Sequence, residues 1–181
     1  MAAKSSPFAV LANIDKRSRA LSKGLPAQEE AVELWHGIGF MLDGKRYVAP
    51  MGEVVEILHI PRYTQVPGVK PFMLGAANVR GRLLPVIELA SFVDLPRSSR
   101  AQRDRRVLVV EQDDIFCGLI VDAVLGMQYF AVDSFTGSND DADVSLQPFL
   151  RGAYERNDEQ WAVFSMVELV EDERFLDAAV W

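Results

Sequence analysis

Short apolar runs separated by tight-turn signals dominate the chain from Trp35 onward, and this spacing constrains the fold more than any other feature. The runs HGIGFML, KRYVAP and EVVEIL are separated by Asp43-Gly44 and by Pro50-Met51-Gly52. An Asp-Gly pair between two apolar runs is a hairpin signal. Two further runs, RVLVVEQ and IFCGLIVDAVLGMQYF, flank Asp113-Asp114. Many short strands with few helices predict a mainly β fold, a barrel or a sandwich, and argue against a doubly wound α/β fold.

Two segments of the chain resemble each other. FMLGAANVRGRLLPVIEL and FLRGAYERNDEQWAVFSMVEL each run from an apolar residue through a glycine and a turn into an apolar strand that ends in Glu-Leu. A repeated unit of this kind indicates two similar sub-barrels. We expect LLPVIEL to be a strand that leads into a short helical turn. We expect WAVFSMVEL to be the second strand of a hairpin, and EDERFLDAAVW to form a closing C-terminal helix.

The first 34 residues form a different kind of segment. Pro7 suits the first position of a helix, and apolar residues then recur at about helical spacing. These residues are Phe8, Leu11 and Ile14. KGLPAQEE breaks the pattern, because it contains both glycine and proline. We therefore expect residues 1–34 to be an N-terminal helical extension and residues 35–175 to be the folded domain. The extension could pack on the domain or act as a separate docking arm.

Composition narrows the possible functions. The formal net charge is -7, and an acidic surface repels nucleic acid and anionic lipid unless it carries a basic patch. The one cysteine, Cys117, excludes an internal disulfide and fits a reducing compartment. We see no secretory signal and no apolar run near the roughly 18 residues that a membrane helix needs. We therefore expect a cytoplasmic protein.

The sequence offers little support for catalytic, phosphate or metal sites. Gly81 is followed by Arg-Leu, whereas a phosphate-binding loop needs Lys and Ser or Thr there. Neither His36 nor His59 has a Cys or His at ligand spacing, and NDDAD lacks the glycine and the final glutamate of a calcium loop. Cys117 has no basic neighbour that would activate it. We therefore expect no enzymatic activity, no metal and no cofactor.

An arginine-rich loop leaves one alternative open. RSSRAQRDRR, residues 97–106, holds five arginines and could attract RNA. It has no interleaved aromatic residue on which a base could stack, and the rest of the chain is acidic. A solvated hairpin loop is the favoured interpretation, and an RNA-binding small β-barrel stays a remote alternative.

Four motifs, taken together, resemble the CheW-like family. ANVRGRLLPVIEL resembles the family's Asn-Leu-Arg-Gly-x-x-x-Pro-Val/Ile-x-Asp/Glu-Leu signature. YVAPMGEVVEIL, FCGLIVDAVLGM and FLRGAY resemble three further family elements, and all four occur in the family's order. Val79 stands where Leu is commoner, and WAVFSMVEL replaces a run that usually ends in Leu-Leu-Asp. The N-terminal arm and the region after it resemble the CheW-like adaptors of chemosensory systems that control type IV pili.

The resemblance implies a CheW-like fold of two small SH3-like β-barrels that share a core. It also implies a non-enzymatic scaffold or adaptor. Such adaptors couple methyl-accepting receptors to the regulatory domain of a CheA-type histidine kinase, here in control of type IV pilus twitching motility. A CheW-type adaptor of flagellar chemotaxis is the alternative within the family. The expected location is the cytoplasm, with membrane receptor arrays reached only through the partners.

The resemblance also carries residue roles. By position, Glu56 and Ile57 match family residues that contact the kinase. Arg80 matches the family arginine tied to receptor binding, and the Asn78–Gly81 turn would hold it at the surface. Gly75 matches a glycine at the edge of these surfaces. Arg80 could instead be a local clamp on the Gly75–Gly81 turn.

Three apolar residues match positions of the groove near the receptor contact: Val54, Val124 and Met127. A groove lined by such side chains can accept one face of an amphipathic receptor helix. The alternative is that they are ordinary core residues. Both remain open, because the sequence does not fix which face of a strand points outward.

Overall fold

The computed structural model of the chain describes residues 7–21, 33–96, 98–137 and 142–179. The chain divides into two compact units, Met1–Val32 and Glu33–Trp181. In the first unit, helix α1 spans Pro7–Leu21, and the apolar side chains named above are exposed on it. KGLPAQEE lies outside the described residues. The expected boundary between an extension of residues 1–34 and a domain of residues 35–175 stays a prediction.

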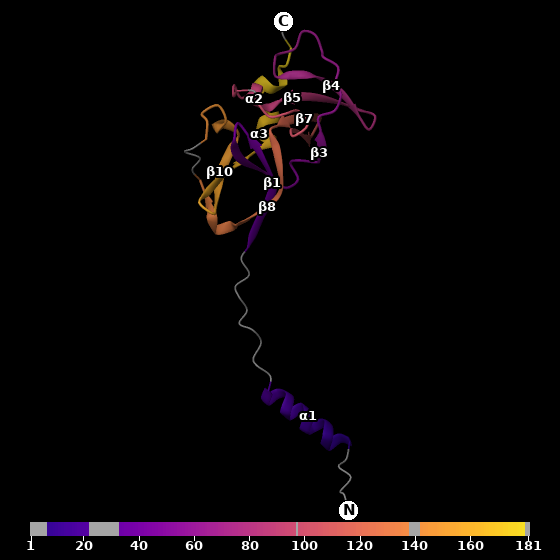
Figure 1. The fold of residues 1–181 in the computed structure, drawn as a ribbon, viewed down its shortest axis with the longest axis vertical. Helices are drawn as coiled ribbons and strands as arrows, with labels where there is room; N and C mark the ends of the chain where they lie inside the picture. The colour runs from indigo at the N-terminus through magenta and orange to yellow at the C-terminus, as the bar shows by residue number, and fades with distance from the viewer. Residues whose placement is uncertain (1–6, 22–32, 97, 138–141, 180–181) are drawn as a thin grey trace, which may run out of the picture. The chain divides into compact units, whose positions relative to one another are not determined.

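The described part of the second unit is mainly β, as predicted. Its strands are β1 Leu34–Leu42, β2 Lys45–Pro50, β3 Glu56–His59, β4 Met73–Val79, β5 Arg82–Glu88, β6 Arg106–Gln112, β7 Ile115–Val121, β8 Ala123–Ala131, β9 Phe135–Thr136, β10 Leu150–Arg156 and β11 Glu159–Phe164. Sheet A has the order β8-β1-β2-β11-β10-β9, and sheet B has the order β3-β6-β7-β5-β4. Figure 1 shows sheet B toward one end of this unit and sheet A toward the other.

The helices of the second unit are short: α2 Leu89–Phe92, α3 Met166–Val170 and α4 Glu173–Leu176, with 3-10 turns at Val132–Ser134 and Gln147–Phe149. Helix α2 directly follows β5, which confirms the expected helical turn after LLPVIEL. No helix among the described residues is long and apolar enough to cross a membrane.

Two expectations for the C-terminal region were wrong in detail. WAVFSMVEL is not one strand, because β11 ends at Phe164 and the Ser165 hydroxyl accepts a hydrogen bond from the Glu168 N–H at 3.2 Å. This bond caps α3. The closing helix is also shorter than expected, since Asp172 caps the single-turn α4. Val180 and Trp181 lie outside the described residues.

Four hairpins in the described part of the chain turn through two residues each. The turns are Asp43-Gly44, Arg80-Gly81, Asp113-Asp114 and Asn157-Asp158. In each, the first residue has a positive φ between 48° and 54°. Asp and Asn tolerate this left-handed conformation better than other residues with a Cβ. Arg80 is therefore the unusual residue of the four.

The chain crosses between the two sheets twice. Strand β2 belongs to sheet A, but the next strand, β3, pairs with β6 in sheet B. Strand β7 belongs to sheet B, but the next strand, β8, pairs with β1 in sheet A. Residues 51–55 form the first crossover and Asp122 forms the second. Sheet B is therefore built from one continuous segment, β3–β7, inserted between β2 and β8 of sheet A.

The internal resemblance has a structural counterpart. Gly75 in β4 and Gly152 in β10 have φ values of 153° and 138°. A Cβ at Gly75 would lie 2.2 Å from the Thr64 carbonyl oxygen, and a Cβ at Gly152 would lie 2.7 Å from the Thr136 carbonyl oxygen. A side chain at either position would therefore clash with the backbone. The residue after each glycine pairs with that threonine. The repeated Phe-x-x-Gly-Ala therefore marks the same close approach in both sheets.

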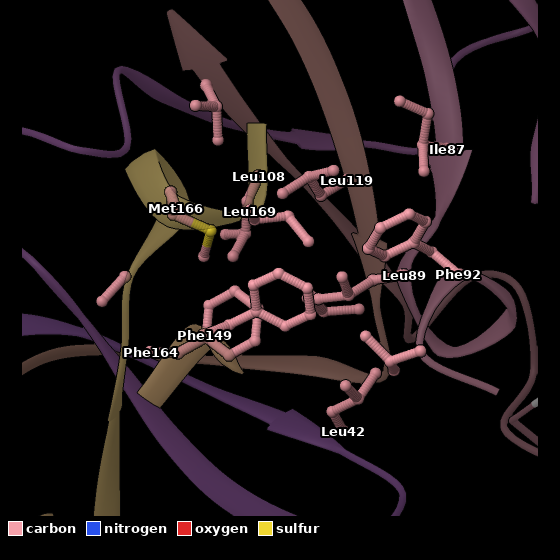
Figure 2. Close-up of a cluster of buried hydrophobic side chains, with 14 of the residues drawn as sticks. Leu42, Ile87, Leu89, Phe92, Leu108, Leu119, Phe149, Phe164, Met166 and Leu169 are labelled. Carbon is pink, nitrogen blue, oxygen red and sulfur yellow. The ribbon is translucent and has the colours of Figure 1, made fainter. Parts of the chain in front are cut away.

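The core confirms two curled sheets, or small barrels, that share a central cluster. Barrel B, the curled sheet B, encloses Ala77, Leu84, Val86, Val107, Val109 and Ile120. Barrel A, the curled sheet A, encloses Val48, Phe130, Tyr154, Trp161 and Val163. The shared cluster draws on both sheets and on α2 and α3, as Figure 2 shows with Leu42, Leu108, Phe164 and Leu169.

Strand β6 shows why its sequence is apolar throughout. Val107 and Val109 face the core of barrel B, whereas Leu108 and Val110 face the shared cluster. Because both faces of the strand are buried, every position from 107 to 110 must be apolar, and the usual alternation is lost.

Alkaline pH should destabilise the fold through two buried groups. Burial raises the pKa of the Cys117 thiol from 9.0 to about 12. Burial, with Asp143 and Asp43, raises the pKa of Tyr47 from 10.0 to about 12. Because the pKa of each group is higher in the folded than in the unfolded state, its contribution to stability is complete below the unfolded pKa. The contribution is lost as the pH rises from the unfolded pKa to the folded pKa. We expect the free energy of unfolding to fall between pH 9 and 12, by up to about 1.4 kcal/mol per pH unit for each group.

Denaturant titrations from pH 8 to 11 measure this loss. Cys117→Ala should remove the part that begins near pH 9, and Tyr47→Phe the part that begins near pH 10. Variants with the same pH slope as the wild-type chain would contradict the assignment.

Candidate functional site

The turn that carries Arg80 is stabilised by the side chain of Asn78. Arg80 and Gly81 both have positive φ, 51° and 82°, and they link the paired residues Val79 and Arg82. This geometry matches the twist of the flanking strands. The Asn78 Oδ1 accepts a hydrogen bond from the Gly81 N–H at 2.9 Å. Asn78 is thus the side chain that accepts a hydrogen bond within the turn, whereas the guanidinium of Arg80 contacts a residue outside the turn.

Arg80 pairs with Glu56. Its Nη2 donates to the Glu56 Oε1 at 2.6 Å, and the side chains are 77% and 27% exposed. Glu56 begins β3, at one edge of sheet B, whereas Arg80 follows β4 at the other edge. The ion pair therefore joins the two edges of the curled sheet. It also brings together one residue matched to the kinase contact and one matched to the receptor contact.

Ile57 faces the other side of β3 from Glu56. Burial alternates along this strand, so Leu58 packs in barrel B while Ile57 is 39% exposed. Val55, just before the strand, is also exposed. Strand β3 is the edge of sheet B, and its pairing within the described sheet is with β6. An exposed edge with apolar side chains is a surface that another protein can cover.

The three expected groove residues do not share one environment. Met127 in β8 is 44% exposed. Val54 and Val124 are half-buried and pack against the shared cluster. The alternative of ordinary core thus applies in part to these two valines and does not apply to Met127.

A neighbouring surface residue was missed from the sequence. Tyr129 lies two residues after Met127 on the same strand, is exposed, and its hydroxyl donates to the Met127 sulfur at 2.8 Å. His36 on β1 is its cross-strand partner. The alternation in the sequence MQY was the available signal, because residues two apart on a strand share a face.

Gly75 has a structural role in the fold that does not depend on any partner surface. The backbone of Thr64 passes so close that no side chain fits. Mutual hydrogen bonds of 2.9 Å between Thr64 and Ala76 then hold the loop against β4. Its place at the edge of a partner surface stays a prediction.

The arginines near the site are mostly engaged in the fold. Arg82 donates two hydrogen bonds to Glu111, at 2.8 and 3.2 Å, and lies over the Phe116 ring. The hydrogen bond from Arg82 also lowers the pKa of Glu111. In the arginine-rich loop, Arg105 forms an ion pair with the buried Glu88. These contacts weaken the case for an RNA-binding loop. Arg97 lies outside the described residues.

No metal site is evident in the part of the chain that the structure describes. No group of three or more His, Cys, Asp or Glu side chains there could hold an ion. Asn139, Asp140 and Asp141 of the acidic NDDAD segment lie outside the described residues.

Two small barrels around a shared cluster, with the Asn-Val-Arg-Gly turn in barrel B, define the class of protein. The CheW-like domain family matches residues 36–174, and the chain belongs to this family. The chain is 53% identical to Protein PilI of Pseudomonas aeruginosa over 97% of both sequences. It is 32% identical to Chemotaxis protein CheW of Bacillus subtilis over 63% of this chain and 75% of that protein.

A solved structure agrees on the fold. The crystal structure of the scaffolding protein TtCheW from Thermoanaerobacter tengcongensis matches with a TM-score of 0.68 and 23% identity. The match covers 78% of this chain and 96% of that one. The prediction of a CheW-like fold is thereby confirmed.

The Glu56–Arg80 ion pair should contribute little to stability. An exposed pair is typically worth about 0–1 kcal/mol, because solvent screens it and two side chains must be ordered. We expect a double-mutant cycle of Glu56→Gln and Arg80→Ala to give a coupling free energy of unfolding below about 1 kcal/mol. A coupling of several kcal/mol would instead make Arg80 a structural clamp of barrel B.

Proposed function

We propose that the chain is a non-enzymatic chemosensory adaptor that couples methyl-accepting receptors to a CheA-type histidine kinase. The system it serves would control twitching motility through type IV pili. Similarity to PilI over 97% of the chain, a span that must include most of the N-terminal arm, favours this role over flagellar chemotaxis. The similarity to Bacillus subtilis CheW covers only 63% of the chain. A flagellar adaptor remains the second candidate.

The single observation that carries the proposal is the ion pair of Arg80 with Glu56 across the two edges of sheet B. An adaptor needs two surfaces that can be occupied together. The exposed edge of β3, with Ile57, offers an apolar surface for the kinase regulatory domain. The adjacent turn offers a cationic fork for the receptor. Their contact through one ion pair supports adjacent binding of both partners.

The receptor side fits a helical partner. The guanidinium of Arg80 is mostly exposed, and the rigid hairpin fixes its direction. A planar guanidinium can bind carboxylates or carbonyls at the end of a helix with two parallel hydrogen bonds. Met127 adds an exposed, adaptable apolar contact of the kind found at helix-binding surfaces.

The proposed role places the chain in the cytoplasm. It would reach membrane receptor arrays through its partners, without inserting into the membrane and without binding nucleic acid. Adaptors of this kind need no cofactor, because their function is to hold two other proteins in a fixed arrangement.

Arg80→Ala should weaken receptor binding about thirty-fold, because truncation of a central interface arginine costs about 2 kcal/mol. Arg80→Lys should recover only part, since it loses the planar fork. Calorimetry with a soluble receptor signalling fragment measures this. Glu56→Gln is the matched control: it breaks the same ion pair but keeps the guanidinium. Equal losses in Arg80→Ala and Glu56→Gln would mean that the ion pair, and not Arg80 itself, supports binding.

Ile57→Glu should weaken binding of the kinase regulatory domain by about 2 kcal/mol or more, roughly thirty-fold, because a charge would enter an apolar contact. Glu56→Lys should act in the same direction. Leu83→Glu is a control, since Leu83 is a more exposed apolar residue on the neighbouring β5 hairpin. Unchanged affinity of folded Ile57→Glu, or an equal loss in Leu83→Glu, would move the kinase contact away from β3.

A further inference from the structure

The crossover that precedes the proposed kinase contact has one deeply placed polar anchor, Glu53. Its side chain is 13% exposed. The Oε2 accepts a hydrogen bond of 2.7 Å from the backbone N–H of Met166, the first residue of α3. The contact joins residues 113 positions apart in the chain. It therefore ties the crossover to a helix that lies after the last strand of sheet A.

A second contact of Glu53 extends this anchor to barrel A. The Nη1 of Arg151, in β10, donates to the Glu53 Oε1 at 3.3 Å. The Nε of Arg151 also donates to the Oε1 of Glu168, in α3, at 3.1 Å. Glu53, Arg151 and Glu168 thus form one network, in which the Arg151 and Glu168 side chains are 43% and 41% exposed.

The other residues of the crossover differ in their exposure and contacts. Gly52 has a φ of 100°, and Met51 and Val55 are exposed. The half-buried Val54 is packed against the shared cluster, and the Val55 N–H bonds to the Val109 carbonyl at 2.9 Å. These contacts hold the far end of the segment to barrel B. At the near end, the Glu53 side chain adds contacts with barrel A to the covalent link from β2 and to the hydrogen bond of 3.2 Å from the Glu53 N–H to the Pro50 carbonyl.

We propose that Glu53 is a positioning residue for the partner surface that begins three residues later, at Glu56. Through Met166 and Arg151 it fixes the crossover against barrel A, and so fixes where Glu56 and Ile57 stand relative to that barrel. The expected effect on kinase binding rests on the proposed function. The geometric part, restraint of residues 54–59 by Glu53, is independent of any partner.

Three variants separate the contacts. Glu53→Gln keeps an oxygen that can accept from the Met166 N–H but loses the ion pair with Arg151. Glu53→Ala loses both. Glu159→Gln is the matched control. It removes a partly exposed ion pair between Glu159 in β11 and Arg46 in β2, and neither of these residues is a partner of the Glu53 side chain.

Hydrogen exchange and calorimetry provide the readouts. In Glu53→Ala, amide exchange of residues 54–59 should rise about tenfold while that of β10 and β11 stays unchanged, and affinity for the kinase regulatory domain should fall about tenfold. Glu53→Gln should lie within about threefold of the wild-type chain on both measures, and Glu159→Gln should equal it. Unchanged exchange of residues 54–59 in Glu53→Ala would overturn the proposal. A uniform rise over both barrels with a lower melting temperature would also overturn it.

The two failures can be told apart. If the wild-type chain does not bind the kinase domain, the proposed function fails, while exchange of residues 54–59 still decides the role of Glu53. If the wild-type chain binds and Glu53→Ala changes neither exchange nor affinity, the function stands and the positioning role is wrong.

Discussion

The cluster of buried side chains shared by the two sheets is the constraint on which the rest of the structure depends. Strands β3–β7 form the whole of sheet B and are inserted between β2 and β8 of sheet A, and both sheets contribute side chains to this cluster. The two barrels must therefore form together around a shared cluster, and strands such as β6 are buried on both faces. The surface formed by Glu56, Ile57 and Arg80 belongs to barrel B, yet its strand β3 emerges from barrel A.

Both crossovers are held in place by carboxylates, although burial of a carboxylate is energetically unfavourable. A buried carboxylate costs free energy unless it is hydrogen-bonded. The Asp122 Oδ2 accepts from the Asp43 N–H at 2.9 Å, and the Asp122 N–H donates to the Met41 carbonyl at 3.0 Å. Asp122 thus ties one crossover to the β1–β2 hairpin, as Glu53 ties the other to α3. In both cases a side chain holds the crossover against elements on the side of sheet A, where the chain passes between the sheets.

The sequence predicted what local chemistry determines. Asp43-Gly44 and the apolar runs around it predicted a hairpin, and the repeated pattern of a glycine, a turn and an apolar strand that ends in Glu-Leu predicted two similar barrels. The helix α3 was missed although Ser165-x-x-Glu168 is a capping-box pattern, because an apolar run was given more weight than a cap. The Glu56–Arg80 and Glu53–Met166 contacts could not be predicted, since they join residues 24 and 113 positions apart. Pairings of that kind depend on how the two sheets close and not on local propensity.

The central claim is that one chain holds two proteins at adjacent surfaces that meet at Glu56 and Arg80 of barrel B. Co-sedimentation tests it most directly, with receptor signalling domains in vesicle-anchored form, the kinase regulatory domain in solution, and increasing amounts of this chain. The account predicts that the kinase domain sediments only when the chain is present, with an amount that rises in proportion to the bound chain. If the chain sediments with the receptor but excludes the kinase domain, or if the kinase domain sediments equally well without it, the two surfaces do not act as an adaptor.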